Sequence, residues 1–197
     1  MTNPHNDHKI DDSDAQHVFN YTSHSFKLND ILYYGDEPED DDLEKITNLQ
    51  KTLAKPAKYS FKVFTGLKWN PVEIWEHQNA SPNESVEVHL PAFTSTSTDK
   101  VVAYNFARLF PKPDLDKLPN LDSRSRAVYN RHEDALNVLE IEITPGTEIG
   151  SVMHVSKHRA EKEMIINSGT TIEIKPNPSC VEHDGFLIII WTGVTKI

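Results

Sequence analysis

The final third of the chain is dominated by segments with the patterns of β-strands, and this feature limits the possible folds more than any other. Residues 136–143 alternate between two sides, and Pro145-Gly146 then supplies a turn. Further strand-like segments follow at 147–152, 164–166, 171–175 and 186–194. Because the expected helices fall mainly before these strands, the sequence predicts an α+β fold with a helical N-terminal part.

The N-terminal half mixes expected helices with three expected strands. A helix over 41–54 is predicted by Leu43, Ile46, Leu49 and Leu53 on one face, and the acidic residues before it complement its dipole. Residues 17–34 are expected to form a short helix and a loop. Segments 59–64, 86–93 and 93–97 read as strands.

A further helix is expected at 100–110, after a cap at Thr98 or Asp99. Its predicted buried residues are Val102, Phe106, Leu109 and Phe110. The long connection at 111–134 carries three prolines and the basic cluster Arg124, Arg126, Arg131 and His132. Connections of that length in compact domains are usually functional or mobile.

Residues 1–16 have almost nothing apolar to bury, so we expect a disordered tail followed by one domain over 17–197. His5 and His8 could bind a metal ion, but no cysteine or further histidine cluster completes a site, so none is expected.

Composition limits the partners that the chain can bind. Among 197 residues, 20 basic against 30 acidic side chains give a net charge of −10, which repels nucleic acid and anionic membranes. Cys180 is the sole cysteine, and no apolar stretch is long enough to span a bilayer. The expectation is a soluble cytoplasmic protein that binds neither membranes nor nucleic acid directly.

Glu161-Lys162-Glu163 places two carboxylates two residues apart, directly before the apolar run 164–166. In an extended strand both acids would project to the same face. Like charges so close repel each other, and a cationic substrate or transition state between them would relieve that repulsion. A solvated strand edge is the alternative for such a short motif taken alone.

Two other motifs precede the acidic pair. Thr65-Gly66-Leu67 follows an expected strand, and a glycine there lets the backbone approach a ligand closely. Thr94-Ser95-Thr96-Ser97-Thr98 is a run of five hydroxyl residues between an apolar strand and a capped helix. A loop is the common reading of a Ser/Thr run, but this placement is more specific.

In this order the three motifs resemble those of the ADP-ribosyltransferases of the Arg–Ser-Thr-Ser–Glu-x-Glu class. That class includes arginine-specific bacterial toxins and small accessory transferases of T-even-type bacteriophages. The resemblance extends from about residue 59 to the C-terminus and implies a split β-sandwich. It also implies NAD as substrate, without a metal, and an arginine of a host protein as acceptor.

The resemblance also implies roles for individual residues. Glu163 would hold the nicotinamide ribose and stabilise the cation that develops as the glycosidic bond of NAD breaks, a device shared with glycoside hydrolysis. Glu161 would orient the incoming guanidinium, and Ser95 would fix the rotamer of Glu163. Thr96 and Ser97 would support the NAD site, and the backbone of Gly66 would hold the nicotinamide amide.

One departure from the family pattern concerns Thr65, which stands where the family has an arginine that contacts NAD. Either Thr65 binds by hydrogen bonding while Lys68, Arg108 or an arginine of 124–131 supplies the charge, or NAD binds more weakly, or another residue is equivalent. Alternative activities are NAD hydrolysis and transfer of NAD-capped RNA. An alternative from a different functional class is an acidic interaction module, a protein that keeps the transferase fold but has lost catalysis.

Overall fold

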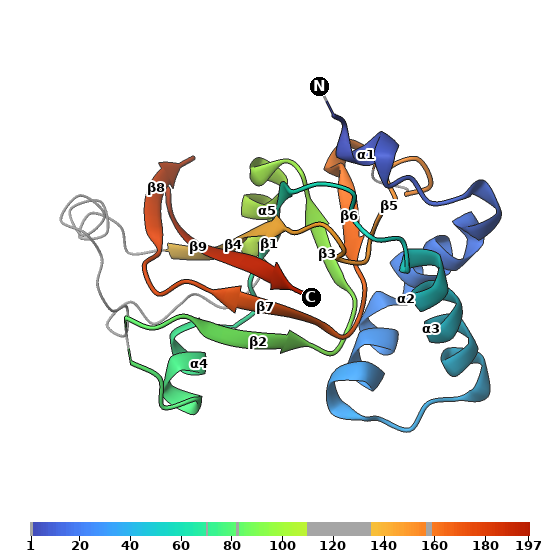
Figure 1. Ribbon diagram of the computed structural model, residues 1–197, viewed down its shortest axis with the longest axis horizontal. Helices are drawn as coiled ribbons and strands as arrows, with labels where there is room; N and C mark the ends of the chain where they lie inside the picture. The colour runs from blue at the N-terminus through green and yellow to red at the C-terminus, as the bar shows by residue number, and fades with distance from the viewer. Residues whose placement is uncertain (1, 70, 82, 110–134, 157–158) are drawn as a thin grey trace.

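The computed structural model describes residues 2–69, 71–81, 83–109, 135–156 and 159–197 (Figure 1). The described ranges form one largely antiparallel sheet with helices packed against it. The basic cluster predicted in the connection 111–134 lies outside these ranges. No helix within them combines the length and apolar character needed to cross a bilayer.

Within the described residues, nine strands pair in the order β2-β7-β9-β4-β1-β3-β6-β5, with β8 added to one end of β9. The pairs are antiparallel except β4 with β9, which is parallel. The strands are β1 Phe61–Gly66, β2 Val86–Leu90, β3 Thr94–Ser97, β4 Ala135–Ile143, β5 Ile149–Ser151, β6 Glu163–Ile166, β7 Thr170–Ile174, β8 Ser179–His183 and β9 Phe186–Lys196.

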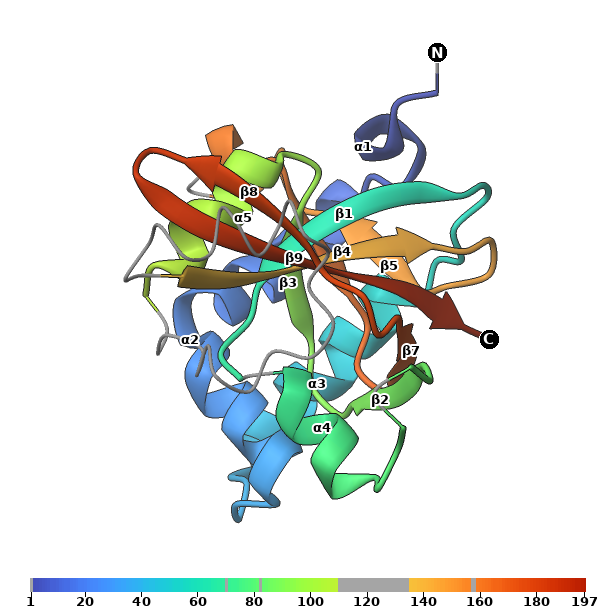
Figure 2. The same ribbon diagram turned by 90° about the vertical axis from the view of Figure 1, so that its left-hand side faces the viewer.

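Helices cover different parts of this sheet. The helical elements are α1 Pro4–Asp7, η1 Asp12–Asp14, α2 Ala15–Tyr34, α3 Asp40–Leu53, α4 Pro71–His77, α5 Lys100–Ala107 and η3 Arg159–Glu161. The paired helices α2 and α3 lie against the end of the sheet made by β3, β6 and β5 (Figure 1). Helix α5 packs over β1 and β4 and lies beside β8 (Figure 2).

Three apolar clusters follow from this arrangement. The largest includes Val63, Leu139, Met164 and Trp191, together with residues of β2, β7 and α4. A second joins α2 and α3 to Phe93 and Ile165. A third lies under α5. Successive residues of β6 therefore belong to different clusters, as expected for a strand buried on both faces.

Most predicted elements are present with shifted ends. The helix expected at 41–54 runs from Asp40 to Leu53, begins with a capping box between Glu39 and Asp42, and buries Ile46, Leu49 and Leu53. Leu43 is an exception, because it is 49% exposed.

Three predictions about the helices need correction. Residues 15–34 form one continuous helix, which Gly35 ends at φ 71°, rather than a short helix and a loop. Helix α5 stops at Ala107 and buries Ala103, Tyr104 and Ala107. Phe106 and Leu109, which we expected in the core, are exposed, because the sheet lies on the other side of this short helix.

The N-terminal segment also differs from its prediction as a disordered tail. Residues 4–7 form α1, and Ile10, His5 and His8 are buried. Lys9 forms a parallel bridge with Ser151 of β5. Disorder was expected because this segment has almost nothing apolar to bury, but its histidines are buried through hydrogen bonds to Ser151, Thr98 and backbone groups.

Candidate active site

Strands β3 and β6 bring the Ser/Thr run and the acidic motif together. In their antiparallel register Ser97 lies opposite Glu163, and Ser95 lies opposite Ile165. Directly opposed residues share a face of the sheet, as do residues two apart in one strand. Ser95, Ser97 and Glu163 therefore lie on one face, and with Glu161 they are called the acidic corner below.

The face that carries the acidic corner is turned toward helix α2. Phe93 and Ile165 occupy the same face of β3 and β6, and both pack with Tyr21 in one apolar cluster. The Tyr21 ring meets the Phe93 ring edge-on at 5.3 Å between centroids. Ser95 is exposed and Glu163 is half-buried, so the corner is open to solvent beside the helix.

The two acids are arranged differently from the prediction. Glu161 ends the 3₁₀ turn η3, Lys162 has φ 48°, and Glu163 is the first residue of β6. The acids are therefore not alternate residues of one extended strand. The left-handed Lys162 redirects the chain between them. Glu161 is half-buried, like Glu163, and its backbone carbonyl lies within reach of Ser97.

Hydrogen bonds hold this turn against β3. The hydroxyl of Ser97 donates to the carbonyl oxygen of Glu161 at 2.5 Å and accepts from the backbone N–H of Asp99 at 2.9 Å. The Lys162 ammonium lies 3.0 Å from the Asp99 carboxylate, and the hydrogen bond that it donates holds the pKa of that carboxyl below its usual range. The position of Glu161 is thus set by Ser97 and by the cap of α5.

Thr96 and Ser97 are buried and bonded within the protein. Thr96 lies on the opposite face from the acidic corner, and its hydroxyl donates to the Met164 carbonyl at 2.8 Å. Both residues therefore support the strand pairing that positions Ser95 and Glu163. Neither hydroxyl is turned freely toward solvent, which makes their expected contribution to an NAD site indirect.

Thr65 and Gly66 lie at the end of β1, next to β3. The Thr65 hydroxyl donates to the Ser95 carbonyl at 3.0 Å. Phe64 lies opposite Ser97, so alternation places the Thr65 side chain on the other face from the acidic corner. A Cβ on Gly66 would come within 2.6 Å of the Ala107 nitrogen, so this glycine admits the backbone of α5.

Two candidates for the cation that replaces the family's arginine are described. The Lys68 ammonium lies 5.1 Å from the ring centroid of Phe26 of α2, and both side chains are exposed. Arg108 is occupied elsewhere, because its guanidinium lies 4.5 Å from the Phe186 ring centroid and 3.6 Å from the Asp184 carboxylate. Lys68 is thus the better placed of the two, since it joins the end of β1 to the helix beside the acidic corner.

The site residue missed by the sequence analysis is Tyr21. Its side chain is 2% exposed, and its hydroxyl accepts a hydrogen bond from the Asn29 amide at 3.2 Å and lies 3.5 Å from the Phe93 carbonyl oxygen. Burial raises the pKa of Tyr21 to about 12, and the negative charge of Glu163 adds to the rise. In the sequence, α3, β1, α4 and β2 lie between Tyr21 and Ser95. No local motif therefore connects the two residues.

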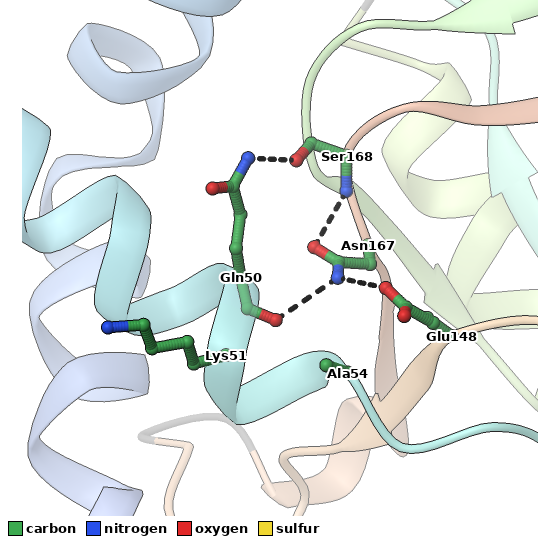
Figure 3. Close-up of a pocket in the computed structure, with 6 residues that line it drawn as sticks. All are labelled: Gln50, Lys51, Ala54, Glu148, Asn167 and Ser168. Carbon is green, nitrogen blue, oxygen red and sulfur yellow. Dashed lines mark hydrogen bonds between the residues drawn. The ribbon is translucent and has the colours of Figure 1, made fainter.

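An open hollow of about 320 Å³ lies away from the acidic corner, at the C-terminal end of α3 (Figure 3). The Asn167 amide donates to the Gln50 carbonyl and to the Glu148 carboxylate, and the Gln50 amide donates to the Ser168 hydroxyl. These groups bond to one another. These hydrogen bonds connect the C-terminal end of α3 to the residues that follow β6, at the opposite end of that strand from Glu163.

Among the residues that the structure describes, no three His, Cys, Asp or Glu side chains gather closely enough to hold a metal ion. The acidic corner itself offers two carboxylates and two serine hydroxyls, with the buried Tyr21 close by. Carboxylates beside an open surface suit the stabilisation of a developing cation.

No protein-family model and no curated protein sequence matches this chain. Solved structures do match. The chain is similar to Plx2a, an ADP-ribosyltransferase toxin from Paenibacillus larvae, with a TM-score of 0.66 and 15% identity, covering 95% of this chain and 88% of that one. It is also similar to the Clostridium limosum C3 exoenzyme, with a TM-score of 0.64 and 12% identity, covering 96% and 87% of the two chains.

A third similar structure is exoenzyme S from Pseudomonas aeruginosa, in complex with human 14-3-3 protein beta and bound to carba-NAD. The TM-score is 0.58 and the identity 16%, covering 93% of this chain and 74% of that one. At such identities the likeness concerns the arrangement of helices and strands. The chain has the ADP-ribosyltransferase fold.

Proposed function

We propose that this protein is an NAD-dependent mono-ADP-ribosyltransferase that modifies an arginine of a host protein and releases nicotinamide. The observation that carries the proposal is the register of β3 and β6, which places Ser95 and Glu163 on one open face. The fold shared with ADP-ribosyltransferase toxins supports NAD as the substrate class.

In the proposed reaction the bond between C1′ of the ribose and the nicotinamide nitrogen breaks, and its electron pair leaves with nicotinamide. Positive charge then develops on the ribose. The half-buried carboxylate of Glu163 would stabilise this charge more strongly than it stabilises the ground state. Ser95, on the same face, would hold that carboxylate in position.

Glu161 would act on the acceptor. A carboxylate matches a guanidinium in bidentate geometry, so Glu161 would orient the arginine nitrogen toward C1′ and take the proton released when the new C–N bond forms. Its attachment to Ser97 through the backbone gives the turn a fixed position. The departure of Glu161 from the strand allows the two acids to face different reactants.

The remaining contacts to NAD would be made by residues at the edge of the acidic corner. Lys68 is proposed to meet the pyrophosphate, because its ammonium is exposed and close to α2. Thr65 would contribute by supporting Ser95 through its carbonyl rather than by contacting phosphate. Gly66, proposed to hold the nicotinamide amide, would do so through its backbone. The arginines of 124–131 remain candidates from outside the described ranges.

The test is incubation of the purified protein with labelled NAD and a bacterial lysate, because we propose a phage-type enzyme acting in the host cytoplasm. Label should appear on a protein band and map to arginine by mass spectrometry. Glu163→Gln should abolish the label, whereas Glu142→Gln, at an exposed strand position remote from the acidic corner, should leave it unchanged.

Glu161→Gln separates the candidate activities on this scaffold. If Glu161 handles the acceptor, this substitution reduces protein labelling more than nicotinamide release. Equal loss of both would favour NAD hydrolysis as the activity. Label that is transferred only from NAD-capped RNA would identify the RNA reaction, and absence of NAD binding in calorimetry would favour the interaction module without catalysis.

A further inference from the structure

The N-terminal segment, residues 2–14, packs against the edge of the sheet near the acidic corner. Helix α1 lies beside β5 (Figure 1), and the backbone N–H of Ser151, the last residue of β5, donates to the His8 carbonyl at 2.8 Å. The Asp7 carboxylate accepts a hydrogen bond from the Tyr59 hydroxyl at 2.7 Å. The segment is therefore fixed to the rest of the fold at more than one point.

His5 connects the two strands that flank β6. Its Nδ1 lies 2.8 Å from the Ser151 hydroxyl, and its Nε2 lies 2.8 Å from the Thr98 hydroxyl. Strand β6 lies between β3 and β5 in the sheet, and Thr98 directly follows β3. The strand registers place both hydroxyl residues at the end of β6 that carries Glu163. His5 therefore joins the neighbours of β6 at the point where that strand begins.

The imidazole ring is well suited to this connection. His5 is 9% exposed, and burial together with the charge of Lys162 lowers its pKa, so the ring is neutral at pH 7. A neutral imidazole has one donor and one acceptor nitrogen, and a hydroxyl can bond to either. Both hydrogen bonds therefore form with either tautomer, and one rigid side chain holds Thr98 and Ser151 together.

Thr98 is in direct contact with the turn that carries Glu161. Its backbone N–H donates to the Lys162 carbonyl at 3.4 Å. The residues on either side of Thr98 hold the same turn, because the Ser97 hydroxyl donates to the Glu161 carbonyl and Asp99 pairs with the Lys162 ammonium. Lys162 has φ 48°, a conformation that is unfavourable for a residue with a side chain, so the turn depends on these contacts.

We propose that His5 is a positioning residue for Glu161, acting through Thr98 on the turn of residues 159–162. With its side chain held by His5, Thr98 keeps the backbone of this turn in one conformation, which limits where the Glu161 carboxylate can reach. Glu163 depends less on His5, because backbone pairing with β3 fixes the start of β6. The acceptor step should therefore be more sensitive to His5 than the cleavage of NAD. This kinetic consequence rests on the proposed function, whereas the effect on the turn does not.

The kinetic test measures two products formed from NAD in the presence of agmatine, a small guanidine that serves as acceptor. One product is free nicotinamide, and the other is ADP-ribosylated agmatine. His5→Phe keeps a buried ring and removes both hydrogen bonds. It should lower the ratio of transferred ADP-ribose to released nicotinamide about fivefold, the size expected for the loss of one hydrogen bond, and change nicotinamide release less than about twofold.

His8→Phe is the matched control. His8 is buried in the same segment and also makes two hydrogen bonds, donating to the Pro4 carbonyl and accepting from the Lys58 N–H. Neither bond involves the turn that carries Glu161. His8→Phe should therefore lower the stability of the protein, as His5→Phe does, and leave the product ratio unchanged.

Thr98→Val tests whether His5 acts through Thr98. It removes the hydroxyl that His5 contacts and keeps the shape and the backbone N–H of the residue. The product ratio should fall as it does in His5→Phe. In the Thr98→Val background, His5→Phe should cause no further fall, because the connection is already broken. Additive falls would show that His5 acts by another route and would refute the inference.

Amide hydrogen exchange, followed by NMR without NAD, tests the turn itself. In His5→Phe the Thr98 amide, which bonds to the Lys162 carbonyl, should exchange about fivefold faster, whereas in His8→Phe the amide that accelerates should be that of Lys58. If wild type forms neither product but these changes appear, the proposed function fails and the positioning of the turn by His5 stands. Unchanged exchange at Thr98, or equal product ratios in active His5→Phe and His8→Phe proteins, would overturn the inference.

Discussion

Gly66 offers a direct choice between two explanations of a glycine at the end of β1. From the sequence it lets the backbone approach a ligand, whereas in the structure it lets β1 approach helix α5. A Cβ at residue 66 would lie 2.6 Å from the nitrogen and 2.8 Å from the Cα of Ala107. Gly66→Ala is therefore expected to destabilise the protein itself, with or without NAD.

The magnitude follows from these distances. Non-bonded heavy atoms prefer separations of about 3.5–4.0 Å, so α5 must move by about 1 Å. Overpacking typically costs about 1–3 kcal/mol, and the upper end applies because Ala107 contributes backbone atoms that cannot rotate away. Reduced entropy of the unfolded chain returns about 0.4–1 kcal/mol. The net loss is about 2 kcal/mol, or a Tm lower by about 4–8 °C.

The assay is urea and thermal unfolding followed by circular dichroism, with Gly150→Ala as the matched control. A Cβ on Gly150 would meet the methyl groups of Leu53 at 2.7 Å and Ile10 at 2.9 Å. Both are side-chain atoms rather than backbone atoms and can yield more easily, so the control should lose less than about 1 kcal/mol. A Gly66→Ala protein as stable as wild type but unable to bind NAD would refute the packing argument and restore the ligand explanation.

The remaining predictions concern pH and NAD affinity. Burial lowers the pKa of both His5 and His154 in the folded protein, so the unfolded chain takes up protons first as the pH falls below about 6.5, and the free energy of unfolding should decrease between pH 7 and pH 5. Urea titrations at those two pH values check this, and His5→Gln should flatten the dependence. Lys68→Ala should raise the KM for NAD several-fold and change kcat little, as expected for the loss of a phosphate contact, whereas Lys175→Ala, at an exposed position after β7, should change neither.

The elements predicted successfully are those whose signal is local. Helix α3 was found from the spacing of Ile46, Leu49 and Leu53, and its acidic start forms a capping box. The hydroxyl strand β3 and the Asp99 cap of α5 were found in the same way. In each, the stabilising contacts lie within one turn or one strand, so sequence spacing was sufficient.

The pairing of the Ser/Thr run with the acidic motif came from resemblance to a family, since no spacing rule sets the register of β3 against β6. The structure shows that register, and it shows Glu161 in a 3₁₀ turn rather than in the predicted strand. The deviation depends on Lys162 at φ 48°, a conformation that side chains rarely adopt and that the sequence does not reveal.

Long-range burial of polar groups was missed altogether. His5 is hydrogen-bonded to Ser151 and Thr98, and Tyr21 packs against Phe93; each contact joins segments far apart in the chain. The polar composition of residues 1–16 suggested disorder because the counting of apolar residues ignores such bonds. For Tyr21, the available signal was Asn29, eight residues later in the sequence. This spacing brings the two side chains together only because residues 15–34 form one continuous helix.

The central claim is that Glu163 acts on the ribose of NAD at a corner built from β3, β6 and α2. Nicotinamide release from NAD by the purified protein, with Glu163→Gln as the comparison, tests it most directly. The account predicts measurable release by wild type and a loss of about a hundredfold or more in the variant, with unfolding free energy unchanged. Equal release by the two proteins would contradict it.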